Sequence, residues 1–232
     1  MTTISFWSRL LDLISPRACR ICGQRLGISE EVICATCNLH LPRTWFCNDA
    51  LDNIMARRFW GRLPIEKAAA LFFYEAGSEV SNIIHSLKYH DHPEIGTIMG
   101  RMAAEEFIPS GFFDGIDLIM PVPLEKKRQR QRGYNQSEEI ARGVAEATGL
   151  ALCTNAVERT SFASSQTRKT LRERMENVEG AFHPTGKADL RGKHILVVDD
   201  IVTSGATICS CVECLLPTDG LRVSVMSLGV VK

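Results

Sequence analysis

The sequence predicts an α/β fold, built on a parallel sheet, with a small zinc-binding segment in front of it. Three observations support this prediction. Residues 195–198 form a short, wholly aliphatic run, which suits a strand buried on both faces of a parallel sheet. Strand-like runs alternate with segments of helical periodicity through residues 61–232. Two CxxC pairs precede them, as in structural zinc sites.

The length and composition limit the number of domains and the kinds of partner that the chain can have. A chain of 232 residues with 45% hydrophobic content can form one large domain, or a medium domain with a small appendage. We expect residues 1–60 to form an N-terminal helix and the zinc-binding segment, and residues 61–232 to form the α/β domain. Lys and Arg total 27, as do Asp and Glu, so no overall positive field attracts nucleic acid and any basic site must be local.

The first fifteen residues predict a short amphipathic helix that packs on the body of the protein. Arg9 and Asp12 interrupt their apolar residues, so the segment does not resemble the core of a signal peptide. A membrane-surface role is the weaker alternative. No apolar run approaches the roughly 18–20 residues that span a bilayer. We therefore expect a cytoplasmic protein, in which four scattered cysteines are free thiols: Cys153, Cys209, Cys211 and Cys214.

The two CxxC pairs are Cys19 with Cys22 and Cys34 with Cys37. Each pair can place two thiolates on one ion, and two pairs complete the closed tetrahedral site of structural zinc. A disulfide framework conflicts with the absence of a secretion signal, and a redox CxxC would normally occur once. Four thiolates leave no open position, so we predict a structural role for the zinc.

The elements that follow are predicted from hydrophobic periodicity. Residues 71–74 indicate a strand, and Ser78 caps a helix whose apolar residues recur at positions 80, 83, 84 and 87. His90 to Pro93 break this helix, and a second helix runs over residues 94–107. Residues 38–66 show no clear period. A strand over residues 116–123 ends in prolines, and a helix over residues 137–147 ends at Gly149.

A basic loop connects that strand to that helix. Residues 125–132 contain five cations and one glutamate. A run of charge is usually a solvated face. Here, however, right-handed crossovers place the loop on the same edge of the sheet as the end of the 195–198 strand. The cations can therefore bind a polyphosphate or, as an alternative, the backbone of a nucleic acid.

Residues 158–182 are polar, basic and poor in core residues. A long stretch of this kind in a compact domain is usually a lid or disordered. A lid that closes would exclude water from a reactive intermediate. We therefore predict a lid over the sheet edge.

The most informative stretch begins with the 195–198 strand. Asp199 and Asp200 follow it, then a loop of small and hydroxyl residues at 203–207, then a helix predicted over residues 206–216. Carboxylates at a strand end can accept hydrogen bonds from sugar hydroxyls and help to hold Mg²⁺. The loop presents N–H groups at a helix start, which is a ready phosphate site. An isolated Asp-Asp pair or Ser-Gly turn would instead be an ordinary connection with a helix cap. Residues 221–231 predict a last strand.

Taken together, these motifs resemble the ComF/GntX family of phosphoribosyltransferase-like proteins. The resemblance extends almost from end to end. It rests on the four zinc-knuckle cysteines, on Lys88 within residues 84–89, on Arg132-Gly133-Tyr134-Asn135-Gln136, on Gln166 and Arg174 in the predicted lid, and on residues 198–207. It implies a type I phosphoribosyltransferase fold behind a zinc-binding segment, and a link to natural competence, in which members are thought to help take up DNA.

The resemblance also implies a site for Mg²⁺ and phosphoribosyl pyrophosphate (PRPP). Asp199 and Asp200 would hold the ribose hydroxyls and act in catalysis. The 5′-phosphate would lie on the loop, and the pyrophosphate would lie near Lys126, Lys127, Arg128 and Arg132. The expected PRPP-binding residues are Asp199, Asp200, Ile201, Val202, Thr203, Ser204, Gly205, Ala206 and Thr207.

Three functions remain open at this stage. The first, which we expect, is transfer of phosphoribosyl to an unidentified nitrogen acceptor. Alternatively the chain binds PRPP, a nucleotide or single-stranded DNA without turnover, in which case aromatic residues would stack on bases. The candidates are Tyr89, Tyr134, Trp45 and Trp60. A purely structural protein would leave the acid pair unexplained. Competence proteins are further candidate partners, and the oligomeric state is not predicted.

Overall fold

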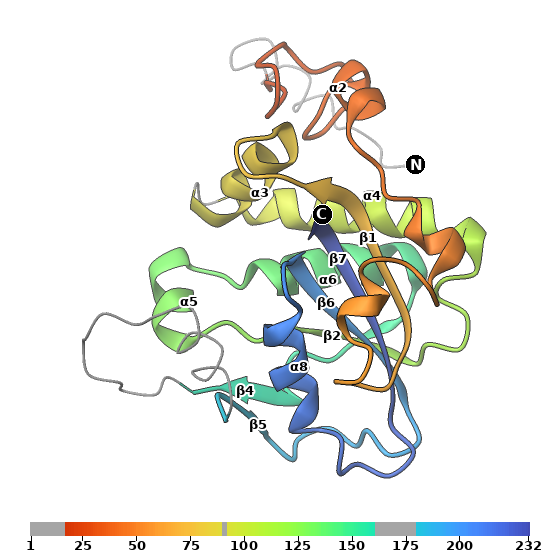
Figure 1. Cartoon of the computed structure of the whole chain (residues 1–232). Helices are drawn as coiled ribbons and strands as arrows, with labels where there is room; N and C mark the ends of the chain where they lie inside the picture. Colours follow the sequence, from red (N-terminus) through yellow and green to blue (C-terminus); the bar gives the residue numbers. More distant parts are fainter. Residues whose placement is uncertain (1–16, 90–91, 161–179) are drawn as a thin grey trace.

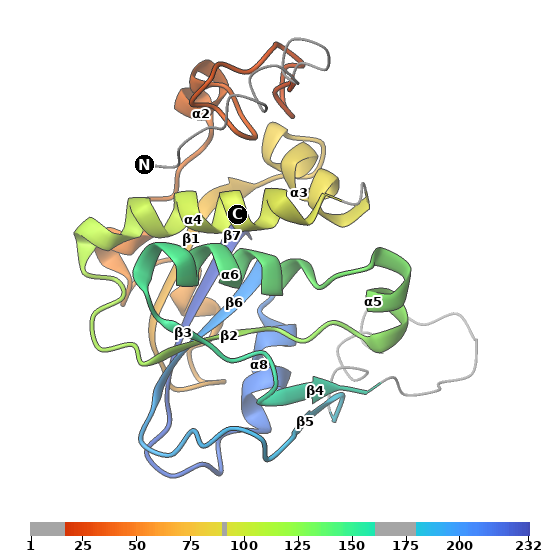
Figure 2. The same ribbon diagram turned by 180° about the vertical axis from the view of Figure 1, so that it is seen from behind.

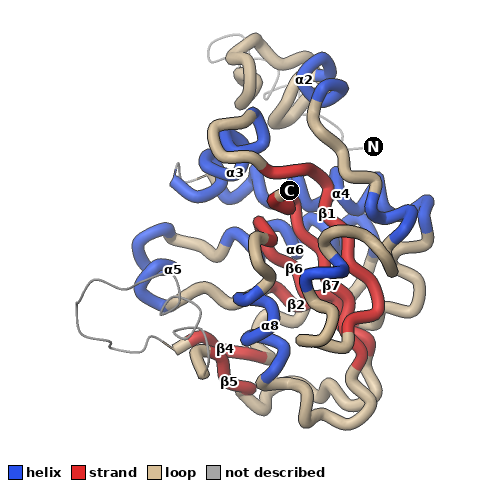
Figure 3. The backbone as a smooth tube through the Cα atoms, in the orientation of Figure 1, coloured by secondary structure: helices blue, strands red, loops and turns tan. Residues whose placement is uncertain are grey.

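The computed structural model describes residues 17–89, 92–160 and 180–232. Its centre is a five-stranded parallel sheet in the order β1-β7-β6-β2-β3. The strands are β1 (Ile65–Tyr74), β2 (Leu118–Pro121), β3 (Ala151–Leu152), β6 (His194–Val202) and β7 (Arg222–Val231). Figure 3 shows them as one layer with helices on both sides. The predicted α/β class with a parallel sheet is confirmed.

Three helices cover one face of the sheet: α3 (Glu79–Tyr89), α4 (Pro93–Phe107) and α6 (Gln136–Thr148). The other face carries α8 (Ala206–Glu213) and the short 3₁₀ turn η2 (Ala56–Arg58), which lie in front of the strands in Figure 1. The remaining short elements are α2 (Ala35–His40), η1 (Phe46–Asp49), η3 (Ile108–Ser110) and α5 (Lys126–Arg132).

Side chains of successive sheet residues enter two different cores. Leu196 and Val198 of β6 pack with the α3, α4 and α6 face, whereas Ile195 and Val197 pack with α8 and η2. All four are fully buried. This explains why residues 195–198 are continuously aliphatic, because a strand covered on both faces has no polar side.

Helices α4 and α6 pack unusually closely through glycines. A Cβ at Gly143 would lie 1.9 Å from the carbonyl oxygen of Thr97, and one at Gly100 would lie 2.1 Å from that of Ile140. Only glycine allows the two backbones this approach. The pair forms a rigid support behind the sheet, and α6 begins directly at the candidate site.

Several predicted boundaries differ from the structure. Strand β1 begins at Ile65 rather than at Leu71, because its alanine-rich first half is also buried in the sheet. Helix α8 ends at Glu213, three residues before the predicted Leu216. Part of the basic stretch that we predicted as a loop is helix α5, which Gly133 ends with φ of 81°.

The structure describes the two ends of the predicted lid, which spans residues 158–182. Residues 158–159 and 182 belong to a two-stranded antiparallel hairpin, β4 (Val157–Arg159) with β5 (Phe182–Pro184). The expected N-terminal helix and most of the lid, including Gln166 and Arg174, lie outside the described residues. Within the described part of the chain, no helix combines the length and the apolar character needed to cross a membrane.

Candidate active site and metal centre

The acid pair lies in the last part of β6, the strand between β7 and β2. Asp200 is 7% exposed and Asp199 is half-buried. Each carboxylate accepts a hydrogen bond from the next backbone amide, at 2.9 Å from Asp200 N to Asp199 Oδ1 and 2.7 Å from Ile201 N to Asp200 Oδ1. The strand thus fixes both carboxylates locally before any other residue contacts them.

The Tyr-Asn-Gln part of the basic loop reaches this pair from the end of the neighbouring strand. Asn135 donates through Nδ2 to the carbonyl oxygen of Val122 at 3.0 Å and accepts from the amide of Ser137, capping α6. Gln136 Nε2 lies 3.4 Å from Asp200 Oδ2, and Ser137 Oγ donates to Asp199 Oδ1 at 2.9 Å. The first turn of α6 therefore holds both carboxylates.

Lys88, at the end of α3, supplies a cation to the same pair. Its Nζ lies 2.8 Å from Asp200 Oδ2. The hydroxyl of Tyr134 donates to the carbonyl oxygen of Leu87 and so ties the end of α3 to the loop before α6. Four residues grouped only by family resemblance, Lys88, Tyr134, Asn135 and Gln136, thus meet at one place.

Burial and the neighbouring carboxylate raise the pKa of Asp199 to about 7. Ser137, the amide of Asp200 and the charge of Lys88 act in the opposite direction. The pair can therefore hold a proton near neutral pH, and a bound cation would favour its full ionisation.

One buried atom at the site has no hydrogen-bond partner among the described residues. Gln136 Oε1 makes no hydrogen bond to any described residue, although Gln136 is only 7% exposed. Burying an unpaired acceptor is unfavourable. The two carboxylates and this amide oxygen are hard oxygen donors, the type that Mg²⁺ prefers. The residues present therefore fit Mg²⁺ bound together with an oxygen-rich ligand.

The loop after the acid pair surrounds a small hollow. Gly205, with φ of 76°, is the N-cap of α8, and Ser204 Oγ lies 3.4 Å from the amide of Ala206. Backbone amides at a helix start attract anions. The hollow is lined by Asp199, Ile201, Val202, Thr203, Gly205, Ala206, Thr207 and Ile208. Asp199 of the acid pair and the phosphate loop thus line one hollow.

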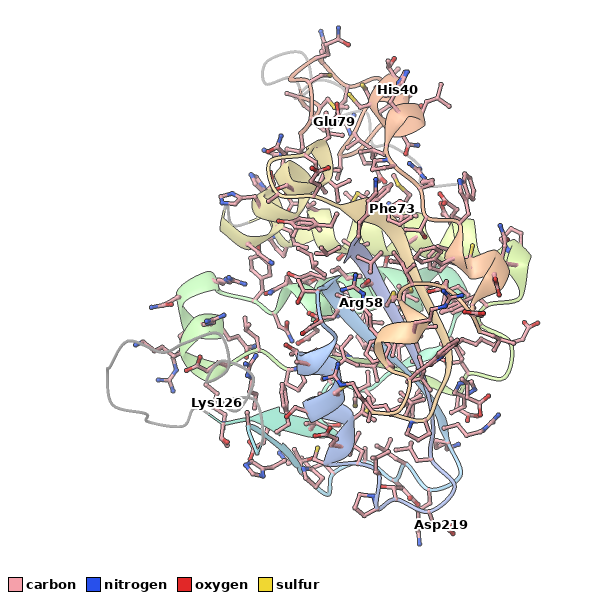
Figure 4. The ribbon with its side chains drawn as sticks, in the orientation of Figure 1. His40, Arg58, Phe73, Glu79, Lys126 and Asp219 are labelled. Carbon is pink, nitrogen blue, oxygen red and sulfur yellow. The ribbon has the colours of Figure 1, made fainter. Side chains whose placement is uncertain are left out.

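The cations predicted to bind pyrophosphate lie on or at the end of α5. Lys126 pairs with Glu158 of β4 at 3.3 Å, and Arg128 lies 3.8 Å from Glu125. Lys127 is exposed and Arg132 is half-buried. Figure 4 labels Lys126 on the side where α5 approaches β4. The structure places this group beyond the end of β2, and its two described ion pairs are exposed and readily exchanged.

The sequence did not single out two residues at the site. Ser137 was assigned only to the start of a helix, yet it contacts Asp199. Arg159 of β4 lies over the ring of Phe182, 5.1 Å from its centroid, and interacts electrostatically with Asp199 and Arg128. Burial lowers the pKa of Arg159. Arg159 therefore adds a cation between the acid pair and α5.

The four predicted zinc ligands converge in the N-terminal segment, beyond α3 in Figure 1. Their Sγ atoms all lie within 4.8 Å of one another, and the Sγ atoms of Cys22 and Cys34 are 3.8 Å apart. A tetrahedron with Zn–S bonds of about 2.3 Å has edges of about 3.8 Å, so the cluster fits zinc.

Backbone amides support these sulfurs as metal ligands. The amide of Cys34 donates to Cys19 Sγ at 3.3 Å, and that of Cys37 to Cys34 Sγ at 3.5 Å. Burial alone would raise the pKa of Cys19, but backbone hydrogen bonds from Cys22, Cys34 and Ile21 lower it to about 7. Thiolates are the metal-binding form, so the cluster can bind a metal such as zinc.

Comparison with known proteins is consistent with this geometry. Residues 85–228 match the phosphoribosyl transferase domain family. The chain is 29% identical over 226 residues to "DNA utilization protein YhgH" of Salmonella typhi, covering 93% of this chain and 98% of that protein. It is 23% identical to "Competence protein ComFC" of Bacillus subtilis, covering 97% and 88%. "Competence protein F" of Haemophilus influenzae is 29% identical over 93 residues, covering 40% and 41%.

The family match includes the end of α3, the acid pair and the phosphate loop. The match does not include the cysteine cluster, which lies before residue 85. The match extends over 144 of the 232 residues (85 to 228), which is more than half of the chain. The protein therefore belongs to the phosphoribosyl transferase domain family, as a ComF-like member with an N-terminal cysteine cluster.

Proposed function

We propose that the protein binds Mg²⁺ and PRPP and transfers the phosphoribosyl group to a nitrogen acceptor. The observation that carries this proposal is the hollow that Asp199 of the acid pair shares with Thr203, Gly205, Ala206 and Thr207 of the loop. Lys88 and Gln136 contact the carboxylate of Asp200, and Ser137 donates a hydrogen bond to that of Asp199. This arrangement matches the two ends of a phosphorylated sugar, with hydroxyls on the acids and the phosphate on the loop.

The proposed reaction requires no protein nucleophile. The bond from C1′ to the pyrophosphate oxygen breaks, and pyrophosphate leaves with the bonding electron pair. The acceptor nitrogen forms the new bond to C1′ with its lone pair and then loses a proton to solvent. Positive charge develops on the sugar, and carboxylates fixed beside it stabilise that charge. Mg²⁺ would enter with PRPP and neutralise part of the charge of its pyrophosphate.

The leaving group would lie towards α5. Lys126, Lys127, Arg128 and Arg132 belong to that side of the site, and Arg159 lies between α5 and Asp199. The ion pairs of Lys126 and Arg128 are exposed, so these side chains can exchange a carboxylate for a phosphate with little loss.

The acid pair can be tested directly. We expect the double variant Asp199→Asn, Asp200→Asn to lose binding of Mg²⁺ and PRPP in calorimetry while its zinc content is unchanged. Asp219→Asn is the matched control. Asp219 is exposed and lies just before β7, at the opposite end of the parallel strands from the acid pair (Figure 4). Unchanged PRPP affinity in the double variant would overturn the assignment.

Turnover is tested separately from binding. Release of pyrophosphate from PRPP in the presence of nitrogen acceptors would support the enzyme. Binding of PRPP without release, over a panel of bases and amines, would identify a PRPP-binding protein that does not catalyse transfer.

A role in DNA uptake is the wider setting that we propose. It is supported by the names of relatives, "DNA utilization protein" and "Competence protein". Direct binding of single-stranded DNA is favoured by one feature, the exposed cations of α5. Lys127 and Arg130 are both exposed on this helix. Lys127→Gln with Arg130→Gln should weaken DNA binding and reduce its dependence on salt. An unchanged salt slope would exclude α5 as the DNA site.

A further inference from the structure

Part of the phosphate loop's surroundings comes from outside the matched domain. Residues 55–63 precede residue 85, yet they lie against the face of the sheet that carries α8. Four of their side chains, Met55, Ala56, Phe59 and Leu63, are buried in the same core as α8 and β7. The structure thus joins an N-terminal segment firmly to the back of the candidate site.

Phe59 fixes the loop from behind. A Cβ at Gly205 would lie 2.9 Å from Cε1 of the Phe59 ring. Phe59 is fully buried, so its ring has no space into which it could withdraw. With φ of 76° at Gly205, the loop has both the backbone conformation and the packing that require glycine.

Arg62 fixes the orientation of one peptide group in the loop. Its Nη1 donates to the carbonyl oxygen of Ser204 at 2.7 Å. The same nitrogen lies 3.3 Å from the carbonyl oxygen of Arg58, which steadies the side chain on its own segment. Arg58 in turn donates to the carbonyl oxygen of Val231 at the end of β7, beside which Figure 4 labels it.

This hydrogen bond determines where a loop amide points. The carbonyl of Ser204 and the N–H of Gly205 belong to one peptide group, and none of the described peptide bonds is cis. In a trans peptide group the two point in opposite directions. Because the Ser204 carbonyl points toward Arg62, the N–H of Gly205 points away from Arg62. Gly205 is one of the residues that line the hollow, and Ser204 is not.

We infer that Arg62 is a positioning residue for the phosphate loop: it turns the Ser204 carbonyl away from the bound 5′-phosphate and the Gly205 N–H toward it. A carbonyl dipole facing a phosphate would repel it, whereas an N–H would bind it. The inference rests on the proposed function for the identity of the anion. The orientation of the peptide group is a property of the free protein and does not depend on that function.

The test compares Arg62→Gln with Arg57→Gln. Arg57 lies on the same segment, pairs with Asp52 at 2.7 Å and has no part in the site, so its variant loses a comparable exposed contact. We expect Arg62→Gln to weaken binding of ribose 5-phosphate about tenfold, as for one hydrogen bond to a charged group. Inorganic pyrophosphate should bind both variants and the wild type equally.

A second measurement separates this inference from the proposed function. In the free protein, Arg62→Gln should shift the Gly205 amide resonance in a ¹H–¹⁵N spectrum and increase its hydrogen exchange, and Arg57→Gln should not. An unchanged Gly205 resonance would overturn the role of Arg62 even if PRPP binds. If the resonance shifts but neither ribose 5-phosphate nor PRPP binds the wild type, the peptide orientation stands and the proposed function fails.

Discussion

The ion pair between Lys88 and Asp200 allows a quantitative prediction about stability. The two side chains are 24% and 10% exposed, and the charged atoms are 2.8 Å apart. Removing one partner of a fully buried pair costs about 3–5 kcal/mol, because the other charge is left uncompensated. Lys88 is partly open to solvent, so we expect Lys88→Met to lower the free energy of unfolding by about 2–3 kcal/mol. This corresponds to a fall in Tm of about 4–12 °C for a protein of this size.

The matched control is Lys126→Met. Lys126 also pairs with a carboxylate, that of Glu158, at 3.3 Å, but the two side chains are 70% and 47% exposed. A surface pair of this kind contributes at most about 1 kcal/mol. Chemical denaturation of both variants measures the difference directly. If Lys88→Met is no more destabilising than Lys126→Met, the reasoning about the buried pair is refuted.

A double-mutant cycle isolates the pair from its surroundings. Asp200→Asn removes the ion pair but also removes the repulsion between Asp200 and Asp199, so its net effect on stability is small. Combined with Lys88→Met, the two changes should be non-additive by about 2 kcal/mol. Additive effects would show that Lys88 stabilises the end of α3 in some other way.

Three further predictions concern protons, metal and packing. The folded protein holds a proton on Asp199 that the unfolded chain releases between pH 3.8 and about 7, so stability should fall as pH rises through this window, by up to about 1.4 kcal/mol per pH unit. Asp199→Asn should flatten this slope in denaturation curves, and an equally steep slope would contradict the shift. Cys22→Ser should abolish stoichiometric zinc by metal analysis, whereas Cys47→Ser, at a buried cysteine outside the cluster, should retain it. Gly143→Ala should lower the free energy of unfolding by about 3 kcal/mol or more, because the new methyl group meets the backbone of α4. Gly149→Ala, the control, should lower it by only about 1–2 kcal/mol, the cost of a positive φ. Equal losses in denaturation would contradict the close packing.

The sequence located the parts of the candidate site that are contiguous in the chain. Asp199, Asp200 and the loop at residues 203–207 follow a strand whose aliphatic run is unambiguous, so the local pattern alone placed them at a sheet edge. The same holds for the cysteine cluster, because the ligand spacing carries the geometry.

Contacts between distant segments could not be predicted in this way. Arg62 meets Ser204 across 142 positions, and Ser137 meets Asp199 across 62. Their residue types are unremarkable in sequence, and only the packing of η2 and α6 on the sheet brings them to the site. A single sequence contains no periodic signal for such pairs.

The missed helix α5 has a different cause. Its residues are lysine, arginine and glutamine, which are good helix formers, and Gly133 supplies the left-handed residue at its end. A dense run of like charge is also typical of a solvated loop, so the charge pattern alone did not indicate a helix. The first half of β1 was missed for the opposite reason, since alanine favours helices and only burial beside β7 makes it a strand.

The strand order has a consequence for how the protein is made. Strand β7 lies between β1 and β6, so β1 cannot become part of the sheet before β7 is synthesised. The end of β1 at Tyr74 and the start of β7 at Arg222 are 148 positions apart (222 less 74). At about 5–20 residues per second, β1 waits about 7–30 s for its neighbour. During that time its apolar edge is open to other chains, so the yield of native protein should depend on chaperones that shield it.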